Sequence, residues 1–357
     1  MRLIPKLQSD FYIIKLFSGP VFSSVRFLIV VGGLFMNLVT PKFYKDFNCI
    51  AGDCPDSCCQ GWEVDADDAS MAYYNTISGE IKNRIDSVLD KDEFGNTIFR
   101  LTENKRCPFL NDENLCDMHI AIGGEHTPYT CRTFPRFINN YGGTREMGIS
   151  FSCPVASEMM WNLQEDFDFE ITVINELPEL NDIDAQLYFK LIQERKKFYS
   201  IARDKSFSIA ERLIKMLECA DNLQSELDDY KDGTEDISFK EVFTNPEVIN
   251  NEWVDKVNNS AYEPVVENTK SNENIIMYFL FRYFLEAVYD RDVLSKVKMA
   301  VAGVLVTSFF GNDDWTIHLW SKETEHSDVN MERYKKLLRT ASSLSCDNLI
   351  DLLKKNG

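Results

Sequence analysis

Residues 49–62 read CIAGDCPDSCCQGW and bring four cysteines into one short stretch of the chain. Two glycines and a proline within this stretch favour tight bends, which allow neighbouring thiolates to face a common centre. Adjacent side chains point apart in most backbone conformations, so Cys58 and Cys59 are not expected to bind the same ion. The stretch therefore predicts a metal-binding turn that serves two centres, or one centre with a spare thiol.

Four more cysteines follow at wider spacings, and single cysteines far apart in a sequence fit a site assembled from several loops. Eight thiolates suffice for two four-ligand centres, or for one cluster with a structural zinc. All-sulfur ligation selects zinc or iron–sulfur over magnesium or calcium. The paired C-x2-C knuckles of zinc fingers are absent, which favours an iron–sulfur cluster, preferably 4Fe–4S, with zinc as the alternative. The predicted metal ligands are Cys49, Cys54, Cys58, Cys59, Cys107, Cys116, Cys131 and Cys153.

The composition argues against a disulfide framework for these cysteines. Disulfide-rich proteins are usually small secreted domains without a sufficient core, whereas this chain has 357 residues, 44% of them hydrophobic. Its formal net charge of −19 disfavours nucleic acid and anionic membranes as partners. We therefore expect a cytoplasmic protein with no nucleic-acid partner and no stable membrane association.

The first 36 residues are predicted to be an extension that takes no part in the fold. Their apolar run, residues 27–36, is too short to span a bilayer, and no small-residue cleavage pattern follows it. Met36 is instead predicted to be the natural start of translation, because the cysteine-rich segment begins soon after it.

The rest of the chain divides into two parts, which we predict to be two domains of a mainly α protein. Residues 37–165 are rich in turn signals and are predicted to form an irregular cysteine-cluster metal-binding domain, with one helix near 66–90. Residues 166–357 are predicted to form an α-helical domain. Its clearest helical periodicity lies at 275–289, and the apolar run 299–310 is predicted to be a buried helix.

Four distinctive motifs lie in the first of these parts. They are TPKFYKDFNCIAGDCPDSCCQGW at 40–62, CPFLNDENLC at 107–116, TCRTFPR at 130–136 and SCPVASE at 152–158. Together they strongly resemble the flagellin lysine-N-methylase (FliB) family, and the segment 49–153 also resembles the YkgJ-type family of zinc- or iron-chelating cysteine-cluster proteins. The first resemblance implies S-adenosylmethionine-dependent methyl transfer to lysine side chains of flagellin, with the cysteine cluster required. A zinc- or iron-binding module without methylase activity is the alternative.

Glu325 and His326 form the strongest polar pair outside the cysteines, and Asn330 follows on the next predicted helix. Lysine methylation requires that the amine lose a proton, and the family resemblance supports Glu325 or His326 as the catalytic proton acceptor or as a substrate contact. The alternative is a loop that ends in a helix cap at Ser327 or Asp328, with His326 exposed. No glycine-rich turn of the dinucleotide-binding type follows a predicted strand, so a doubly wound methyltransferase fold is not expected.

Other residues of the cysteine segment have weaker assignments. His119 and His126 are alternative ligands that could replace a thiolate. Trp62 is expected to pack over the first cysteine turn. The remaining cysteines, Cys219 and Cys346, stand apart from the cluster in the sequence and are not expected to bind metal.

Overall fold

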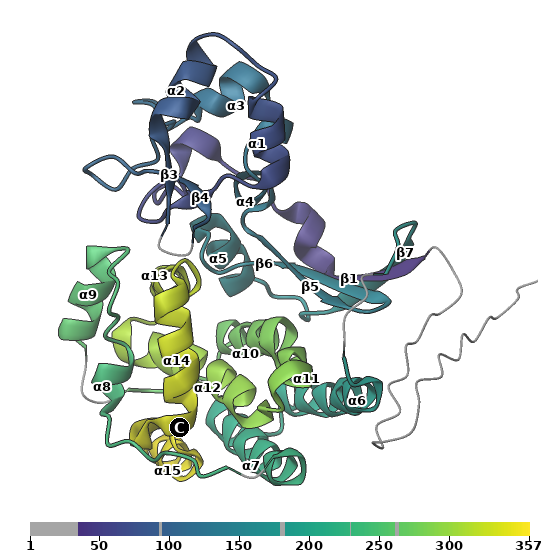
Figure 1. Cartoon of the computed structure of the whole chain (residues 1–357). Helices are drawn as coiled ribbons and strands as arrows, with labels where there is room; N and C mark the ends of the chain where they lie inside the picture. Colours follow the sequence, from purple (N-terminus) through teal and green to yellow (C-terminus); the bar gives the residue numbers. More distant parts are fainter. Residues whose placement is uncertain (1–34, 93–94, 179–182, 229, 261–263) are drawn as a thin grey trace, which may run out of the picture.

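The computed structural model describes the chain at residues 35–92, 95–178, 183–228, 230–260 and 264–357 (Figure 1). The predicted N-terminal extension lies outside these residues, except for its last two positions. One of them, Met36, belongs to the fold: it begins strand β1, Met36–Pro41, and its side chain is only 1% exposed. The use of Met36 as the start of translation stays a prediction.

The helices that follow residue 184 form a bundle around two apolar helices, as the helical periodicity predicted (Figure 1). In α10, Lys270–Tyr283, and α12, Val293–Phe310, most side chains are buried. Gly303 of α12 permits close contact between the two helices, because a Cβ at this position would lie 2.5 Å from Cε2 of Phe279. Other helices of the bundle are α6, Ala185–Ala202; α7, Ile209–Leu227; α8, Phe239–Val242; α9, Asn251–Asn258; α11, Ala287–Asp290; α13, Asp314–Glu325; α14, Asp328–Thr340; and α15, Cys346–Asn356.

The buried apolar helix predicted at 299–310 corresponds to α12. Among the described residues it is the only helix that is long and apolar enough to cross a membrane, and 89% of that stretch is buried inside the protein. The core helix of a globular protein satisfies the same criteria of length and composition.

A four-stranded sheet is formed largely by strands of the first part of the chain, in the order β5-β6-β1-β7. β5, Arg136–Tyr141, and β6, Thr144–Ile149, form a hairpin, and β1 runs parallel to β6. β7, Phe169–Ile174, pairs antiparallel with β1, so the sheet continues past the domain boundary predicted at residue 165. These strands are missing from the sequence-based prediction, because short β segments depend on partners that are distant in the chain.

The helix predicted near 66–90 is in fact two short helices, α1, Asp68–Tyr74, and α2, Glu80–Val88. Gly79 precedes α2 with a φ of 97°, a conformation that interrupts a helix and that glycine adopts readily. A small three-stranded sheet accompanies them, in the order β2-β4-β3. Its strands are β2, Val64–Asp65; β3, Leu89–Lys91; and β4, Thr97–Phe99. The remaining helices of this segment are α3, Asp117–Ile122; α4, Tyr129–Thr133; and α5, Pro154–Trp161.

Candidate metal centre

The ten cysteines all lie within the described residues, and all are free thiols. The structure therefore gives no support to a disulfide framework. Within the part of the chain that is described, no three Cys, His, Asp or Glu side chains are placed so that they could hold one metal ion. Metal binding would require the thiols to move closer together than they lie in this structure.

Four thiols nevertheless form a first set of neighbours. They are Cys59, Cys107, Cys116 and Cys131. The backbone N–H of Cys107 donates to the carbonyl of Cys59 at 2.8 Å, which places the first turn beside the loop that follows β4. Burial, together with the charges of Cys59 and Cys116, raises the pKa of Cys107 to about 12. Burial also raises the pKa of Cys131, and the other three thiols of this set add to the rise.

A second set contains Cys49, Cys54 and Cys153. Burial, with charges from the other two, raises the pKa of Cys153 to about 11. Cys58 has neighbours in both sets, and its thiol, directly beside Cys59, lowers the pKa of Cys59 to about 7. The expectation that Cys58 and Cys59 do not bind the same ion stays a prediction. The eight thiols thus form one set of four, one set of three and Cys58 between them.

Asp56, within the cysteine turn, is held by two buried side chains of α13. His318 and Lys322 are four residues apart on this helix, so both reach the same carboxylate. His318 Nε2 lies 2.9 Å from Asp56 Oδ2, and Lys322 Nζ lies 2.5 Å from Oδ1. Although burial raises the pKa of Asp56, the hydrogen bond from His318 and the charge of Lys322 hold it at about 2. A buried charged cluster thus fastens the cysteine turn to the helical bundle.

Sequence reasoning missed His318 and Lys322. Their i, i+4 spacing is visible in the string HLWSK, but the same spacing is typical of a solvated helix face. Their burial, at 0% and 2% exposure, is what distinguishes them. His318 makes a further contact near the thiols, because its Nδ1 lies 3.2 Å from the carbonyl oxygen of Phe151, two residues before Cys153.

Glu325, the first predicted catalytic residue, is a buried carboxylate surrounded by donors. It accepts hydrogen bonds from Ser150 Oγ at 2.5 Å, Tyr283 Oη at 2.7 Å and Tyr278 Oη at 3.3 Å. Arg282 adds an ion pair at 3.0 Å. Because a carboxylate offers about four acceptor positions, the protein itself saturates Glu325. This arrangement suits an anchor for α10 better than a free proton acceptor, and the catalytic role stays a prediction.

His326, the second predicted catalytic residue, lies in an aromatic corner. Its ring stacks on Trp62 with a centroid distance of 4.4 Å and meets Phe134 at 5.3 Å. The alternative in which His326 is exposed is therefore wrong, although Ser327 does cap α14 as that alternative predicted. Burial and nearby cationic side chains lower the pKa of His326 to about 3, so the ring is neutral at pH 7. Its Nδ1 has no hydrogen-bond partner among the described residues.

Trp62 connects this aromatic corner to the cysteine turn. Its indole Nε1 donates to the carbonyl oxygen of Cys58 at 2.8 Å, which confirms that Trp62 packs over the turn. The two histidines considered as alternative ligands lie elsewhere: His126 stacks on Tyr73 at 3.7 Å, and His119 is exposed. Neither belongs to a group that could hold a metal in the part of the chain described here.

Replacing Asp56 with asparagine should lower the free energy of unfolding by about 3 kcal/mol, because buried His318 and Lys322 would lose their shared counter-charge. Urea unfolding of Asp56→Asn and of the unchanged protein measures this difference. Asp53→Asn is the matched control, since Asp53 belongs to the same turn but is exposed. Equal losses in the two variants would show that the contacts with α13 contribute nothing specific.

His326 should make the fold sensitive to mild acid. Its pKa of about 3 in the folded protein lies below the ordinary value near 6.5. As the pH falls from about 6.5 towards 3, the imidazole therefore binds a proton in the unfolded chain but not in the folded chain. The free energy of unfolding decreases as a result. Between pH 6.5 and 5, His326→Gln should reduce the slope of stability against pH by up to about 1.4 kcal/mol per unit. An unchanged slope for His326→Gln would contradict the assignment.

Comparisons with known proteins find distant relatives. The chain is 24% identical over 132 residues to the flagellar biosynthetic protein FliU of Salmonella muenchen, a match that covers 36% of this chain and 78% of that protein. Over the same length and at the same identity it matches lysine-N-methylases of Salmonella typhimurium and Salmonella choleraesuis, of which it covers 33% each.

The chain thus spans about a third of the length of the two lysine-N-methylases. No family model matches it, so the resemblance to the YkgJ-type family stays a prediction. No solved structure matches it either. The comparisons therefore establish a distant similarity to proteins named lysine-N-methylase and FliU.

Proposed function

We propose that this chain is a protein lysine N-methylase that uses S-adenosylmethionine to modify flagellin and contains an essential cysteine-ligated iron–sulfur centre. The observation that carries the proposal is that Trp62, which donates a hydrogen bond to the carbonyl of Cys58 in the cysteine turn, stacks on His326 at the end of α13. The names of the distant relatives support the reaction and the flagellar substrate. The acidic chain, with its net charge of −19, is also compatible with a substrate that presents lysines.

The two sets of thiols are the proposed ligands of the metal. Cysteine thiolates bind both iron–sulfur clusters and zinc, and a bound cluster would supply redox-active iron while tying its ligand loops together. Burial raises the pKa of Cys54, whereas a thiol hydrogen bond lowers that of Cys59. In both cases the charge of Lys322 acts to lower the pKa. Lys322 thus favours the thiolate form in one member of each set.

The two predicted catalytic residues have different proposed roles. Methyl transfer needs an unprotonated amine in line with the methyl donor. Glu325 is saturated by its donors and would position Tyr283 and Arg282. His326 is neutral, and its Nδ1 has no hydrogen-bond partner among the described residues, so it suits a hydrogen-bond acceptor for the substrate. A ring with a pKa near 3 is a weak base, and a substrate contact is therefore a better role for it than general-base catalysis.

The second candidate is a zinc- or iron-binding module without methylase activity. The observation that favours it is the partial overlap with the lysine-N-methylases, which leaves two thirds of their length without a counterpart in this match. In that case the thiols would bind metal to stabilise the segment before α5, and no methyl group would be transferred.

The metal part of the proposal predicts that the chain, purified anaerobically, contains iron and acid-labile sulfide. Serine substitution at any of the eight clustered cysteines should lower the iron content, because each removes a thiolate ligand. Cys219→Ser is the control and should retain the metal, since Cys219 lies on α7, outside both sets. A protein that contains only zinc would overturn the iron–sulfur assignment. Loss of metal from Cys219→Ser would overturn the ligand set.

The enzymatic part predicts that the metal-loaded chain transfers labelled methyl groups from S-adenosylmethionine to lysines of flagellin. Mass spectrometry of the flagellin would locate the label. His326→Gln should reduce the rate by about tenfold or more, and His119→Gln should not change it. If the metal-loaded protein transfers no methyl group, the binding module is the correct function.

A further inference from the structure

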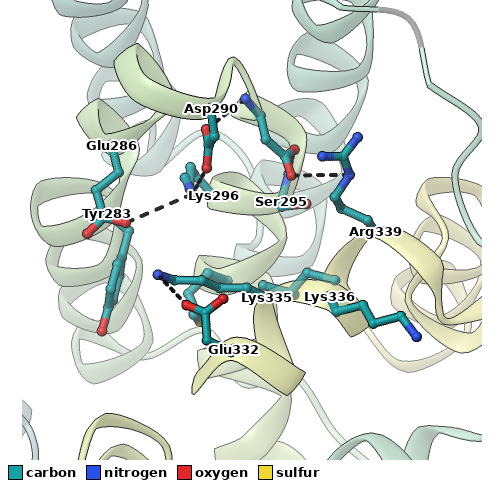
Figure 2. Close-up of a pocket in the computed structure, with 12 residues that line it drawn as sticks. Tyr283, Glu286, Asp290, Ser295, Lys296, Glu332, Lys335, Lys336 and Arg339 are labelled. Atoms are coloured by element: carbon teal, nitrogen blue, oxygen red, sulfur yellow. Dashed lines mark hydrogen bonds and ion pairs between the residues drawn. The ribbon is translucent and has the colours of Figure 1, made fainter. Parts of the chain in front are cut away.

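A cavity of about 280 Å³ lies where the end of α10, the start of α12 and α14 meet (Figure 2). Its inner part is lined by two buried side chains, Tyr283 and Met299, whereas its mouth carries charged groups such as Glu332, which is 75% exposed. The volume corresponds to about nine water molecules at roughly 30 Å³ each. It is suited to one amino-acid side chain better than to a complete nucleoside-bearing cofactor.

Glu286 is a carboxylate of the cavity lining whose one ion pair among the described residues is long. Glu286 lies near Tyr283 in Figure 2, and its side chain is 29% exposed. Its ion pair with Lys296 is long, at 3.9 Å, because Lys296 lies closer to Asp290, at 2.6 Å. Burial raises the pKa of Glu286, while the charges of three cations act to lower it. These cations are Lys296, Lys335 and Arg282. A ligand cation placed directly at the carboxylate would add to these more distant charges.

The other acidic side chains of the lining have closer counter-charges. Arg339 lies 3.7 Å from Asp292, and Lys335 lies 3.5 Å from Glu332. Asp292 is further engaged as the N-cap of α12. Glu286 is therefore the lining carboxylate best placed to accept a positive charge from a ligand.

One residue that lines the cavity also contacts the predicted catalytic carboxylate. Tyr283, which lines it, donates a hydrogen bond from its hydroxyl to Glu325 at 2.7 Å. Glu325 in turn accepts a hydrogen bond from Ser150, three residues before Cys153. One tyrosine thus separates the cavity from the predicted catalytic carboxylate and the loop that carries a predicted metal ligand.

We propose that this cavity binds the side chain of a lysine residue in a protein substrate, with Glu286 as the counter-ion of its ammonium group. The methylene chain would contact Met299 and the ring of Tyr283, since long cationic side chains pack their stems on apolar surfaces and place their charge near aromatic rings. The inference rests on the proposed function, because it assigns the substrate side chain of the same reaction to a place in the fold.

The test uses the full chain and two small probes, Nα-acetyl-lysine methylamide and Nα-acetyl-norleucine methylamide, with binding followed by NMR titration. The lysine probe should bind at least tenfold more tightly than norleucine, which has a similar stem without the ammonium. Glu286→Gln should weaken binding of the lysine probe at least tenfold. Glu332→Gln is the matched control at the exposed mouth and should change it less than twofold. Thermal unfolding would verify that both variants are folded.

Several results would overturn the inference. Equal binding of the two probes would show that the ammonium is not recognised. An unchanged affinity in Glu286→Gln, or an equal loss in Glu332→Gln, would remove Glu286 as the specific counter-ion. Binding of S-adenosylmethionine that depends on Glu286 and displaces the lysine probe would assign the cavity to the methyl donor instead.

The binding experiment needs neither a metal nor a methyl donor, so its failure is distinguishable from failure of the proposed function. Glu286-dependent binding of the lysine probe, together with no methyl transfer by the metal-loaded chain, would overturn the methylase proposal and support the cavity as a lysine-binding site. Methyl transfer that is unchanged in Glu286→Gln would leave the methylase proposal intact and overturn the role of the cavity.

Discussion

The buried cluster of Asp56, His318 and Lys322 is the contact on which the arrangement of the candidate site depends. Removing charged groups from water costs several kcal/mol for each group unless they are paired with good geometry. Here one carboxylate satisfies two donors from the same helix. The residues that it joins, Asp56 and His318, are separated by 262 positions in the chain, so the pairing fastens the cysteine turn to the bundle.

Other polar residues of helix α13 bind further segments of the fold. Glu323, the residue after Lys322, is buried and accepts a hydrogen bond from the backbone of Ile249 at 3.0 Å, which holds the loop before α9. Two residues later, Glu325 binds side chains of α10 and the residue that follows β6. Polar residues of one short helix thus contact four separate segments. An apolar core alone would not specify these relations, because hydrophobic contacts are not directional.

Both the cysteine turn and the cavity are connected by a single aromatic residue to the end of α13. Trp62 and His326 connect the cysteine turn with the corner between α13 and α14. Tyr283 connects the cavity with Glu325. Under the methylase proposal, the residues at the end of α13 take part in function. A metal-binding module would need them only to stabilise the fold.

The sequence by itself indicated the buried helical segments that form α10 and α12, because apolar residues at helical spacing mark their buried faces directly. It also determined that eight cysteines are concentrated between residues 49 and 153. The tertiary structure decided that β7 pairs with β1, and that His318 and Lys322 are buried against Asp56. Each of these depends on close packing between side chains or strands, and most join residues far apart in the chain. Local periodicity contains no information about such contacts, so only the folded chain reveals them.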